Sequence, residues 1–191
     1  MIVGSKYFLF YKPYGVLSQF TDEGTGHPTL KKYINVPDVY AAGRLDRDSE
    51  GLLLLTNDGG LISRLINPER HVPKTYLVQV EGKISSDKLE AFAKGVSLRG
   101  YTTLPCQVRE ISEPQLPPRE KPITPHGPVG WLEVMLNEGK KRQIRHMTAA
   151  VGLLTLRIVR VAIGNLKIEG LQPGEFRELT REELKILKAD Q

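Results

Sequence analysis

Hydrophobic positions along the chain come in short blocks, most of them typical of strands separated by turns. An aromatic block at residues 7–11 ends at the turn Lys12-Pro13-Tyr14-Gly15, and a leucine run at residues 52–56 is typical of a strand buried on both faces. Residues 75–80 alternate and are β-branched, which also favours a strand. Further strand-like blocks lie at residues 96–98, 103–111, 131–136, 157–164, 165–168 and 176–179.

Helix signals are fewer, and they lie at residues 61–66, 86–94, 141–151 and from 180 onward. Asp58 lies in an Asn-Asp-Gly-Gly turn that can cap the first of these helices. Ser86 and Asp87 offer an N-cap for the second helix, and Gly152 closes the third. The sequence Thr-Arg-Glu-Glu at residues 180–183 is a capping box, which predicts a final helix.

Strands therefore outnumber helices, and short turns join many of them. This pattern predicts the α+β class, with a largely antiparallel or mixed central sheet flanked by helices and loops. Six prolines fall within residues 114–128, so this stretch cannot be a helix or a central strand and is predicted to be a surface excursion. We expect residues 1–191 to form one domain, because no linker separates a second one.

The net charge of +5 is concentrated in one part of the chain. Residues 139–168 carry no aspartate or glutamate, and their basic residues are Lys140, Lys141, Arg142, Arg145, Arg157, Arg160 and Lys167. A block of this kind suits a polyanion such as nucleic acid, although a solvated basic face explains the charge equally well.

Several classes of protein are disfavoured by what the sequence lacks. The single cysteine, Cys106, excludes an internal disulfide and a cysteine-based zinc site, and the four histidines have no metal-ligand spacing. No phosphate-binding glycine motif supports a nucleotide cofactor. The longest apolar runs are too short to cross a bilayer, and the first residues do not resemble a secretion signal. We expect a cytoplasmic protein without a metal, a cofactor or a membrane partner.

The densest chemical signal is residues 43–59, Gly-Arg-Leu-Asp-Arg-Asp-Ser-Glu-Gly-Leu-Leu-Leu-Leu-Thr-Asn-Asp-Gly. It is a charged loop, bounded by glycines, that leads into a buried strand, and such a loop can hold a carboxylate in a fixed position. The pattern does not choose among Asp46, Asp48, Glu50 and Asp58. Asp58 also suits a turn or a cap, and Asp48 and Glu50 also suit a solvated turn.

This segment resembles the signature of the RsuA-type pseudouridine synthases (RsuA, RluB, RluE and RluF). The resemblance continues, in the family's order, at residues 12–15, 74–76, 138–147 and 158–164, and covers the chain from near residue 7 to near residue 180. The family breaks the C1′–N1 glycosidic bond of a uridine, rotates the base and rejoins it through C5, without a metal or an organic cofactor. Many members carry an N-terminal S4 domain, whereas this chain begins at the catalytic domain and is most similar to the single-domain RluE-like members.

The resemblance implies a role for each of five residues. Asp46 takes the place of the catalytic aspartate, which either attacks C1′ or removes the 2′ proton. Arg145 matches the arginine that partners this carboxylate, and Tyr76 matches the tyrosine that stacks on the flipped uracil. Ile158 falls where relatives place an aliphatic residue beneath the base. Arg44 is expected to fix the loop or to contact RNA.

The expected partner is RNA, above all ribosomal RNA, with 23S RNA preferred. Helical spacing places Ile144, Met147 and Val151 on a core-facing stripe and Arg142, Arg145 and His146 on another face. Candidates for phosphate contacts are Lys140, Lys141, Arg142, His146 and Arg160, with Lys12 as a weaker one. A transfer RNA synthase and a non-catalytic ribosome-assembly factor are the alternative functions, and we expect the protein to be a monomer.

Overall fold

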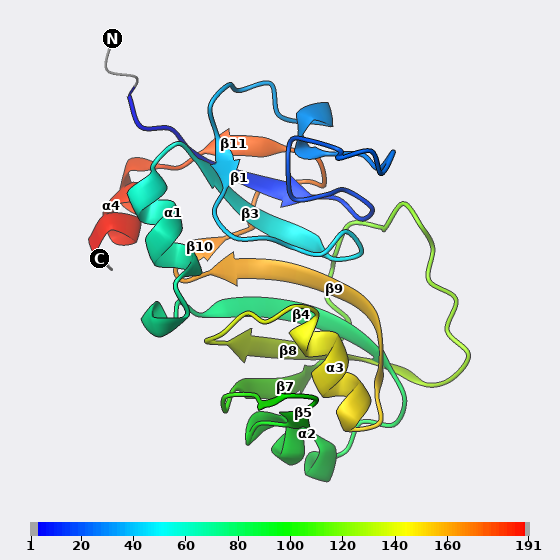
Figure 1. Cartoon of the computed structure of the whole chain (residues 1–191). Helices are drawn as coiled ribbons and strands as arrows, with labels where there is room; N and C mark the ends of the chain where they lie inside the picture. Colours follow the sequence, from blue (N-terminus) through cyan, green and yellow to red (C-terminus); the bar gives the residue numbers. More distant parts are fainter. Residues whose placement is uncertain (1–3, 190–191) are drawn as a thin grey trace.

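The computed structural model describes residues 4–189, which fold around one nine-stranded sheet (Figure 1). The main path of the sheet runs through β11 (Phe176–Glu178), β1 (Tyr7–Lys12), β3 (Glu50–Thr56), β9 (Leu154–Ile163), β4 (Lys74–Glu81), β8 (Val129–Leu136) and β7 (Gln107–Ile111). Two short strands pair off this path, β2 (Tyr40–Ala41) with β3 and β10 (Leu166–Lys167) with β9. A separate hairpin consists of β5 (Ser97–Leu98) and β6 (Tyr101–Thr102).

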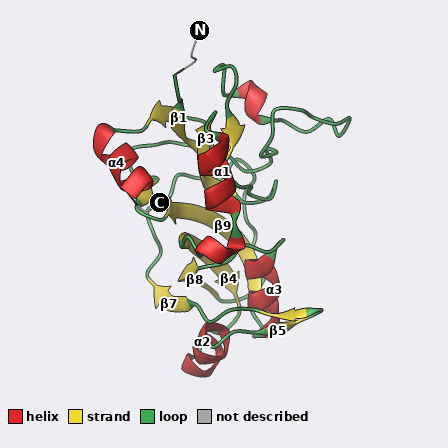
Figure 2. Ribbon diagram, turned by 60° about the vertical axis from the view of Figure 1, so that its left-hand side comes forward, coloured by secondary structure: helices red, strands yellow, loops and turns green. Residues whose placement is uncertain are grey.

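The helices of the described chain are α1 (Gly59–Ile66), α2 (Ser86–Ala93), α3 (Gln143–Ala150) and α4 (Arg181–Ala189). Two 3-10 turns, Leu30–Lys32 and Pro68–Arg70, complete the regular structure. Figure 2 shows α1 and α4 near the β1–β3 half of the sheet and α2 and α3 near its β4–β8 half. The class α+β and the mixed sheet are confirmed, and none of these helices is long and apolar enough to cross a membrane.

The one parallel pair on the main path of the sheet joins β3 to β9, whereas the other neighbours on that path are antiparallel. Gly51 lies opposite Arg160 in this pair and has a φ of +110°. A Cβ atom at Gly51 would overlap the backbone carbonyl of Arg160 and would lie 2.6 Å from its nitrogen. Only glycine permits this close approach, which brings the loop before β3 against the middle of β9.

Both faces of the sheet are buried. Alternation along β1 directs Phe8 and Phe10 to one core, which also holds Ile144 and Met147 of α3, as the helical stripe predicts. Tyr7, Leu9 and Tyr11 face a second core, which α1 and α4 cover. The leucines of β3 alternate between the two cores and are fully buried, so the predicted strand buried on both faces is confirmed. Each buried leucine contributes about 1.5–3 kcal/mol to stability.

The predicted caps are confirmed at two helices and are wrong at a third. Asp58 is the N-cap of α1, and its Oδ1 accepts a hydrogen bond from the Leu61 amide at 2.9 Å. Thr180 and Glu183 form the reciprocal bonds of a capping box at α4. At α2 the N-cap is Ser85, whose side chain makes no capping bond, so the predicted cap by Ser86 and Asp87 is wrong. Three polar residues follow one another there, and composition does not decide which one ends the preceding extended segment.

The proline-rich loop, residues 114–128, forms no helix or strand, as predicted. It is nevertheless tied to the body of the protein at several points. The carbonyl of Pro117 accepts a hydrogen bond from Arg157 at 2.8 Å, and the Arg119 guanidinium lies 4.4 Å from the centre of the Tyr14 ring. Near its end, the His126 amide donates to Glu81 at 2.8 Å. The proline-rich loop is therefore fixed to the body of the protein near both of its ends.

Candidate active site

The loop that carries Asp46 joins β2 to β3 and is fastened from several sides. The Ser18 hydroxyl donates to the Leu45 carbonyl at 2.7 Å and accepts from the Leu45 amide at 3.0 Å. One residue after Asp46, the Arg47 carbonyl accepts a 2.8 Å bond from the Gly15 amide. These bonds connect the loop to the turn at residues 12–15, so two segments that are distant in sequence fix the Asp46 backbone.

Lys12 is the buried support of this turn. Its side chain is fully buried, and Nζ donates to the carbonyls of Pro13, Val16 and Arg47 at 2.9, 2.8 and 3.4 Å. Burial lowers the pKa of the Lys12 ammonium to about 7. Lys12 cannot reach RNA from this position, so its prediction as a phosphate contact is wrong. Sequence reasoning missed its role because it treats a lone lysine in a turn as exposed.

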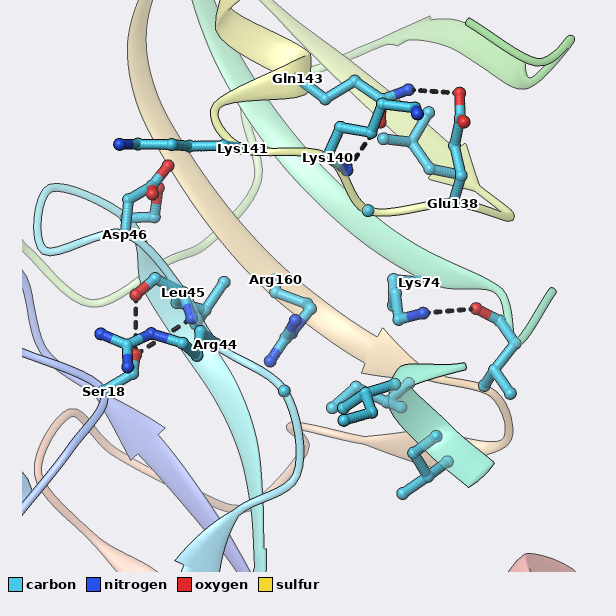
Figure 3. A pocket seen from close by; sticks show the side chains of 18 of the residues that line it. Ser18, Arg44, Leu45, Asp46, Lys74, Glu138, Lys140, Lys141, Gln143 and Arg160 are labelled. Atoms are coloured by element: carbon cyan, nitrogen blue, oxygen red, sulfur yellow. Dashed lines mark hydrogen bonds between the residues drawn. The ribbon is translucent and has the colours of Figure 1, made fainter. Parts of the chain in front are cut away.

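Beside the loop lies a groove of about 1020 Å³, lined by residues from the loop, β4, β9, α1 and the segment before α3 (Figure 3). Its lining includes Asp46, Tyr76 and Ile158, which come from three separate parts of the chain. The Tyr76 and Ile158 side chains belong to the same core on the same face of the sheet, and they are 9% and 5% exposed. The groove thus brings a carboxylate together with an aromatic ring and an aliphatic surface that can receive a flat base.

The carboxylates of the loop meet the basic start of α3. Two nitrogens of Arg142 donate to the two carboxylate oxygens of Asp48 at 3.0 and 3.2 Å. Arg145 Nη2 lies 3.3 Å from Asp48 Oδ2 and donates to the Asp48 carbonyl at 3.0 Å. The basic atom closest to Asp46 among the described ion pairs is Arg142 Nη1, at 3.9 Å from Oδ2. Asp46 keeps a third of its side chain exposed towards the groove.

This arrangement corrects one prediction. Arg145 was expected to pair with Asp46, but its direct ion pair is with Asp48. Arg142 is bonded to Asp48 but keeps 39% of its side chain exposed and lines the groove, so its contact with an RNA phosphate stays a prediction. The physical reason for its bond to Asp48 is that Arg142 has a left-handed backbone conformation, φ +54°, at the N-cap of α3, which turns it towards the loop. Sequence spacing places both arginines on one side of α3 but does not fix which carboxylate they contact.

The pKa values of the cluster follow from these contacts. Partial burial raises the pKa of Asp48, but the hydrogen bond from Arg142 and the charges of Arg145 and Arg142 outweigh it and hold the pKa below its usual value. Burial lowers the pKa of Arg145, and Asp48 offsets only part of that effect. Asp48 is therefore ionised at neutral pH and neutralises part of the arginine charge. The charges of Arg142 and Arg145 also act on Asp46.

Glu50, which follows the loop, is not a solvated turn residue. It is buried as the first residue of β3, and both of its oxygens accept hydrogen bonds from Arg157 at 2.9 and 2.8 Å. Arg157 is thus removed from the basic surface and holds the proline-rich loop through Pro117. Arg160 is only 3% exposed and lines the groove, so it is not part of the outer basic surface, and its phosphate contact stays a prediction. Two of the seven basic residues in the 139–168 block therefore lie inside the protein.

The remaining predicted RNA contacts stay at the surface. Lys140, Lys141 and Arg44 line the groove, and His146 is exposed on α3 without lining it. Lys140 Nζ lies 4.6 Å from the centre of the Tyr101 ring. Arg44 donates to Gln19 at 2.8 Å, so it fastens the loop as one of its two predicted roles requires. The exposed basic residues therefore lie on two sides of the groove, Lys140 and Lys141 before α3 and Arg44 on the loop that carries Asp46 (Figure 3).

A carboxylate fixed beside a groove with one aromatic and one aliphatic wall is a site that can receive a single flat base. A family model described as RNA pseudouridylate synthase matches residues 6–150. The chain belongs to this family and is an RNA pseudouridine synthase, which is an isomerase.

Proteins with curated names are similar in sequence to this chain along most of their own length. Ribosomal large subunit pseudouridine synthase E of Xanthomonas campestris is 53% identical over 173 residues, which cover 88% of this chain and 92% of that protein. The protein of the same name from Vibrio vulnificus is 50% identical over 177 residues, which cover 92% of this chain and 75% of that protein. A solved structure described as a pseudouridylate synthase has a TM-score of 0.81 at 31% identity and covers 97% of this chain and 75% of that one. The pseudouridine synthase fold is confirmed.

Proposed function

We propose that this protein converts one uridine to pseudouridine in the RNA of the large ribosomal subunit, in the cytoplasm, and that it acts as a monomer. The observation that carries the proposal is the convergence of Asp46, Tyr76 and Ile158 on one groove, in a chain that is 53% identical to a large subunit synthase over nearly all of that protein. The expected target class follows from the name of that relative. A transfer RNA substrate and a non-catalytic assembly role remain as outcomes of the test.

Asp46 provides the carboxylate that both candidate routes require. It either bonds to C1′ or takes the 2′ proton, while the electron pair of the C1′–N1 bond leaves with the uracil. The freed base turns and C5 bonds to C1′, while either the Asp46–C1′ bond breaks or Asp46 returns the proton to C2′. The C5 proton is then lost and N1 gains a proton, so atoms and charge balance without another reactant. Arg142 Nη1 lies 3.9 Å from Asp46 Oδ2, and a third of the Asp46 side chain stays exposed towards the groove.

The target uridine must leave the RNA stack before its glycosidic bond can enter the groove. Extrusion of a base costs a few kcal/mol, and contacts with the flanking phosphates must offset it. Lys140, Lys141 and His146 lie exposed at or near the groove on the α3 side and suit this role. Tyr76 then offers a ring on which the extruded base can stack, worth about 1–3 kcal/mol.

The test uses the purified protein with large subunit RNA and with total transfer RNA, followed by mapping of pseudouridine at single-nucleotide resolution. We expect one site in large subunit RNA for the natural chain. Asp46→Asn should fold and bind the same RNA and should form no pseudouridine, because the asparagine amide can neither attack C1′ nor take a proton. The matched control is Asp48→Asn, which removes a neighbouring carboxylate of the same loop and should retain activity within about tenfold.

Each other outcome has a definite meaning. Pseudouridine in transfer RNA alone would show that the substrate is transfer RNA and would support the proposed reaction. No product from any RNA, together with tight binding, would favour the assembly factor. An active Asp46→Asn variant beside an inactive Asp48→Asn variant would move the catalytic role to Asp48. Light scattering of the free protein tests the monomer, and a dimer mass would contradict it.

A further inference from the structure

Arg160 is a buried cation whose side chain is incompletely satisfied. It projects from the middle of β9 into the lining of the groove, on the same face as Ile158 (Figure 3). Its Nε donates to the Leu52 carbonyl at 2.8 Å, but Nη2 is buried without a hydrogen-bond partner. The residue is 97% buried, since only 3% of its surface is exposed. A buried donor left unpaired costs about 1–3 kcal/mol or more for a charged group, so Nη2 is a donor that gains from any acceptor entering the groove.

No carboxylate compensates this charge. Among the ion pairs of residues 4–189, none includes Arg160, although Arg157, three residues earlier on the same strand, is fully paired with Glu50. The neighbouring titratable group of the groove floor is Lys74, whose pKa burial lowers and the charge of Arg160 lowers further. Two cations, Arg160 and Lys74, therefore line the groove, and neither forms an ion pair with a carboxylate of residues 4–189.

The position of Arg160 relates it to the base. In the β4–β9 register Arg160 is the partner of Tyr76, and Ile158 is the partner of Val78. Arg160 therefore adjoins both residues that would enclose a flipped uracil. A phosphate stays with the RNA backbone at the mouth of the groove, whereas the edge of a flipped base is the part that penetrates deepest. Because Arg160 is 97% buried, its guanidinium lies where the edge of a flipped base would reach, below the level of the RNA phosphates.

We propose that Arg160 donates a hydrogen bond to a carbonyl oxygen of the target uracil and stabilises the negative charge that this base carries when the C1′–N1 bond breaks. The proposal rests on the proposed function, because it assigns a role in the same reaction. The electron pair that leaves C1′ is shared between N1 and the two carbonyl oxygens of uracil. A fixed cation at one of these oxygens stabilises the departing anion more than the neutral base, which is how such a donor accelerates bond cleavage.

The symmetry of uracil makes one fixed donor sufficient for the whole reaction. The carbonyls at C2 and C4 flank N3 on either side, and the rotation that replaces N1 by C5 exchanges their places. Arg160 therefore meets a carbonyl oxygen before and after the base turns. Cytosine has an amino group at C4 in place of one of these oxygens and would direct a donor at the arginine in one of the two orientations. The same contact would thus contribute to the choice of uracil over cytosine.

The experiment compares two leaving groups in single-turnover reactions, using the RNA that the natural chain modifies and the same RNA with 5-fluorouridine at the target. Fluorine withdraws electrons and stabilises the uracil anion without help from the enzyme. Both reactions are followed by loss of the N-linked nucleoside after digestion, because fluorine blocks the final loss of the C5 proton. Arg160→Met should slow the uridine reaction by about 100- to 1000-fold and the 5-fluorouridine reaction by less than about tenfold.

The control variant is Val159→Ala, which removes a buried side chain one residue earlier that faces the opposite core. Any rate loss in this variant comes from altered packing and should be the same for both substrates. Arg160→Lys keeps the charge and should recover part of the uridine rate. Equal losses for both substrates in Arg160→Met, or no loss, would overturn the proposal while leaving the synthase activity intact. A natural chain that modifies no RNA would instead refute the proposed function.

Discussion

At the scale of single residues, the proposed reaction can be tested one side chain at a time. Tyr76 is the simplest case, because it is 9% exposed and lines the groove, where we propose that its ring stacks on the base and its hydroxyl takes part in the reaction. Tyr76→Phe keeps the ring and should bind RNA within about threefold of the natural chain, while the isomerisation slows by at least about tenfold. Filter binding and single-turnover rates separate the two effects. A variant that is as fast as the natural chain would show that the hydroxyl has no part in the reaction.

Lys12 predicts a pH dependence of stability. Its pKa is about 7 in the folded protein, against an ordinary value of 10.5, so between these values the unfolded chain binds a proton that the folded chain has lost. The free energy of unfolding should therefore rise with pH across this window, by up to about 1.4 kcal/mol per pH unit from this group, and be unaffected by it below pH 7. Urea unfolding of the natural chain and of Lys12→Met from pH 6 to 10 measures the difference. A constant difference between the two proteins would contradict the prediction.

At the scale of elements, the sequence predicted the features that depend on residues close together in the chain. The leucine run of β3, the Asp58 cap and the capping box of α4 involve neighbours within four residues, and all three are confirmed. Residues that meet across the sheet were not predictable in the same way. The burial of Arg160 and the pairing of Arg142 with Asp48 join segments about 100 residues apart, and no local pattern distinguishes such an arginine from an exposed one. Asp46, Tyr76 and Ile158, which the family resemblance named as site residues, line one groove. The resemblance did not indicate that Arg145 pairs with Asp48.

The start of α4 gives a test at this scale. Glu183 accepts hydrogen bonds from both terminal nitrogens of Arg177 at 2.8 Å and from the Thr180 amide at 2.8 Å. The Arg177 hydrogen bond lowers the pKa of Glu183 from 4.5 to about 2. Its stabilisation is therefore present above pH 4.5 and is lost as pH falls towards 2. Glu183→Ala should cost about 1–2 kcal/mol at pH 7 and much less near pH 2.5, as measured by thermal unfolding. An equal cost at both values would show that the carboxylate charge is unimportant.

At the scale of the whole molecule, burial reduces the basic surface that the sequence suggests. Arg157 and Arg160 are buried, Arg142 and Arg145 are paired with Asp48, and Lys167 is paired with Glu169. Among the described residues of the 139–168 block, Lys140 and Lys141 are therefore the exposed lysines without an ion pair. RNA binding should weaken with salt by about 0.7–0.9 log units per log unit of salt for each phosphate contacted.

The comparison that tests this surface uses two exposed lysines. Lys141→Ala should reduce the salt slope by about one phosphate, because Lys141 lines the groove. Lys185→Ala, on α4 away from the groove lining, is the matched control and should leave the slope unchanged. Titrations of labelled RNA at several salt concentrations give both slopes. Identical slopes for the natural chain and Lys141→Ala would place the RNA elsewhere on the surface.

The parallel pairing of β3 with β9 also determines when the site can form during synthesis of the chain. The loop with Asp46 emerges from the ribosome early in synthesis, but the strand that supplies Ile158 and Arg160 emerges only when about four fifths of the chain has been made. Until then the partner of Gly51 does not exist, and the groove has no floor. Pairings so distant in sequence form slowly, and domains complete themselves only after their last strand is released. The catalytic site should therefore form late in synthesis, after β9 has left the ribosome and paired with β3.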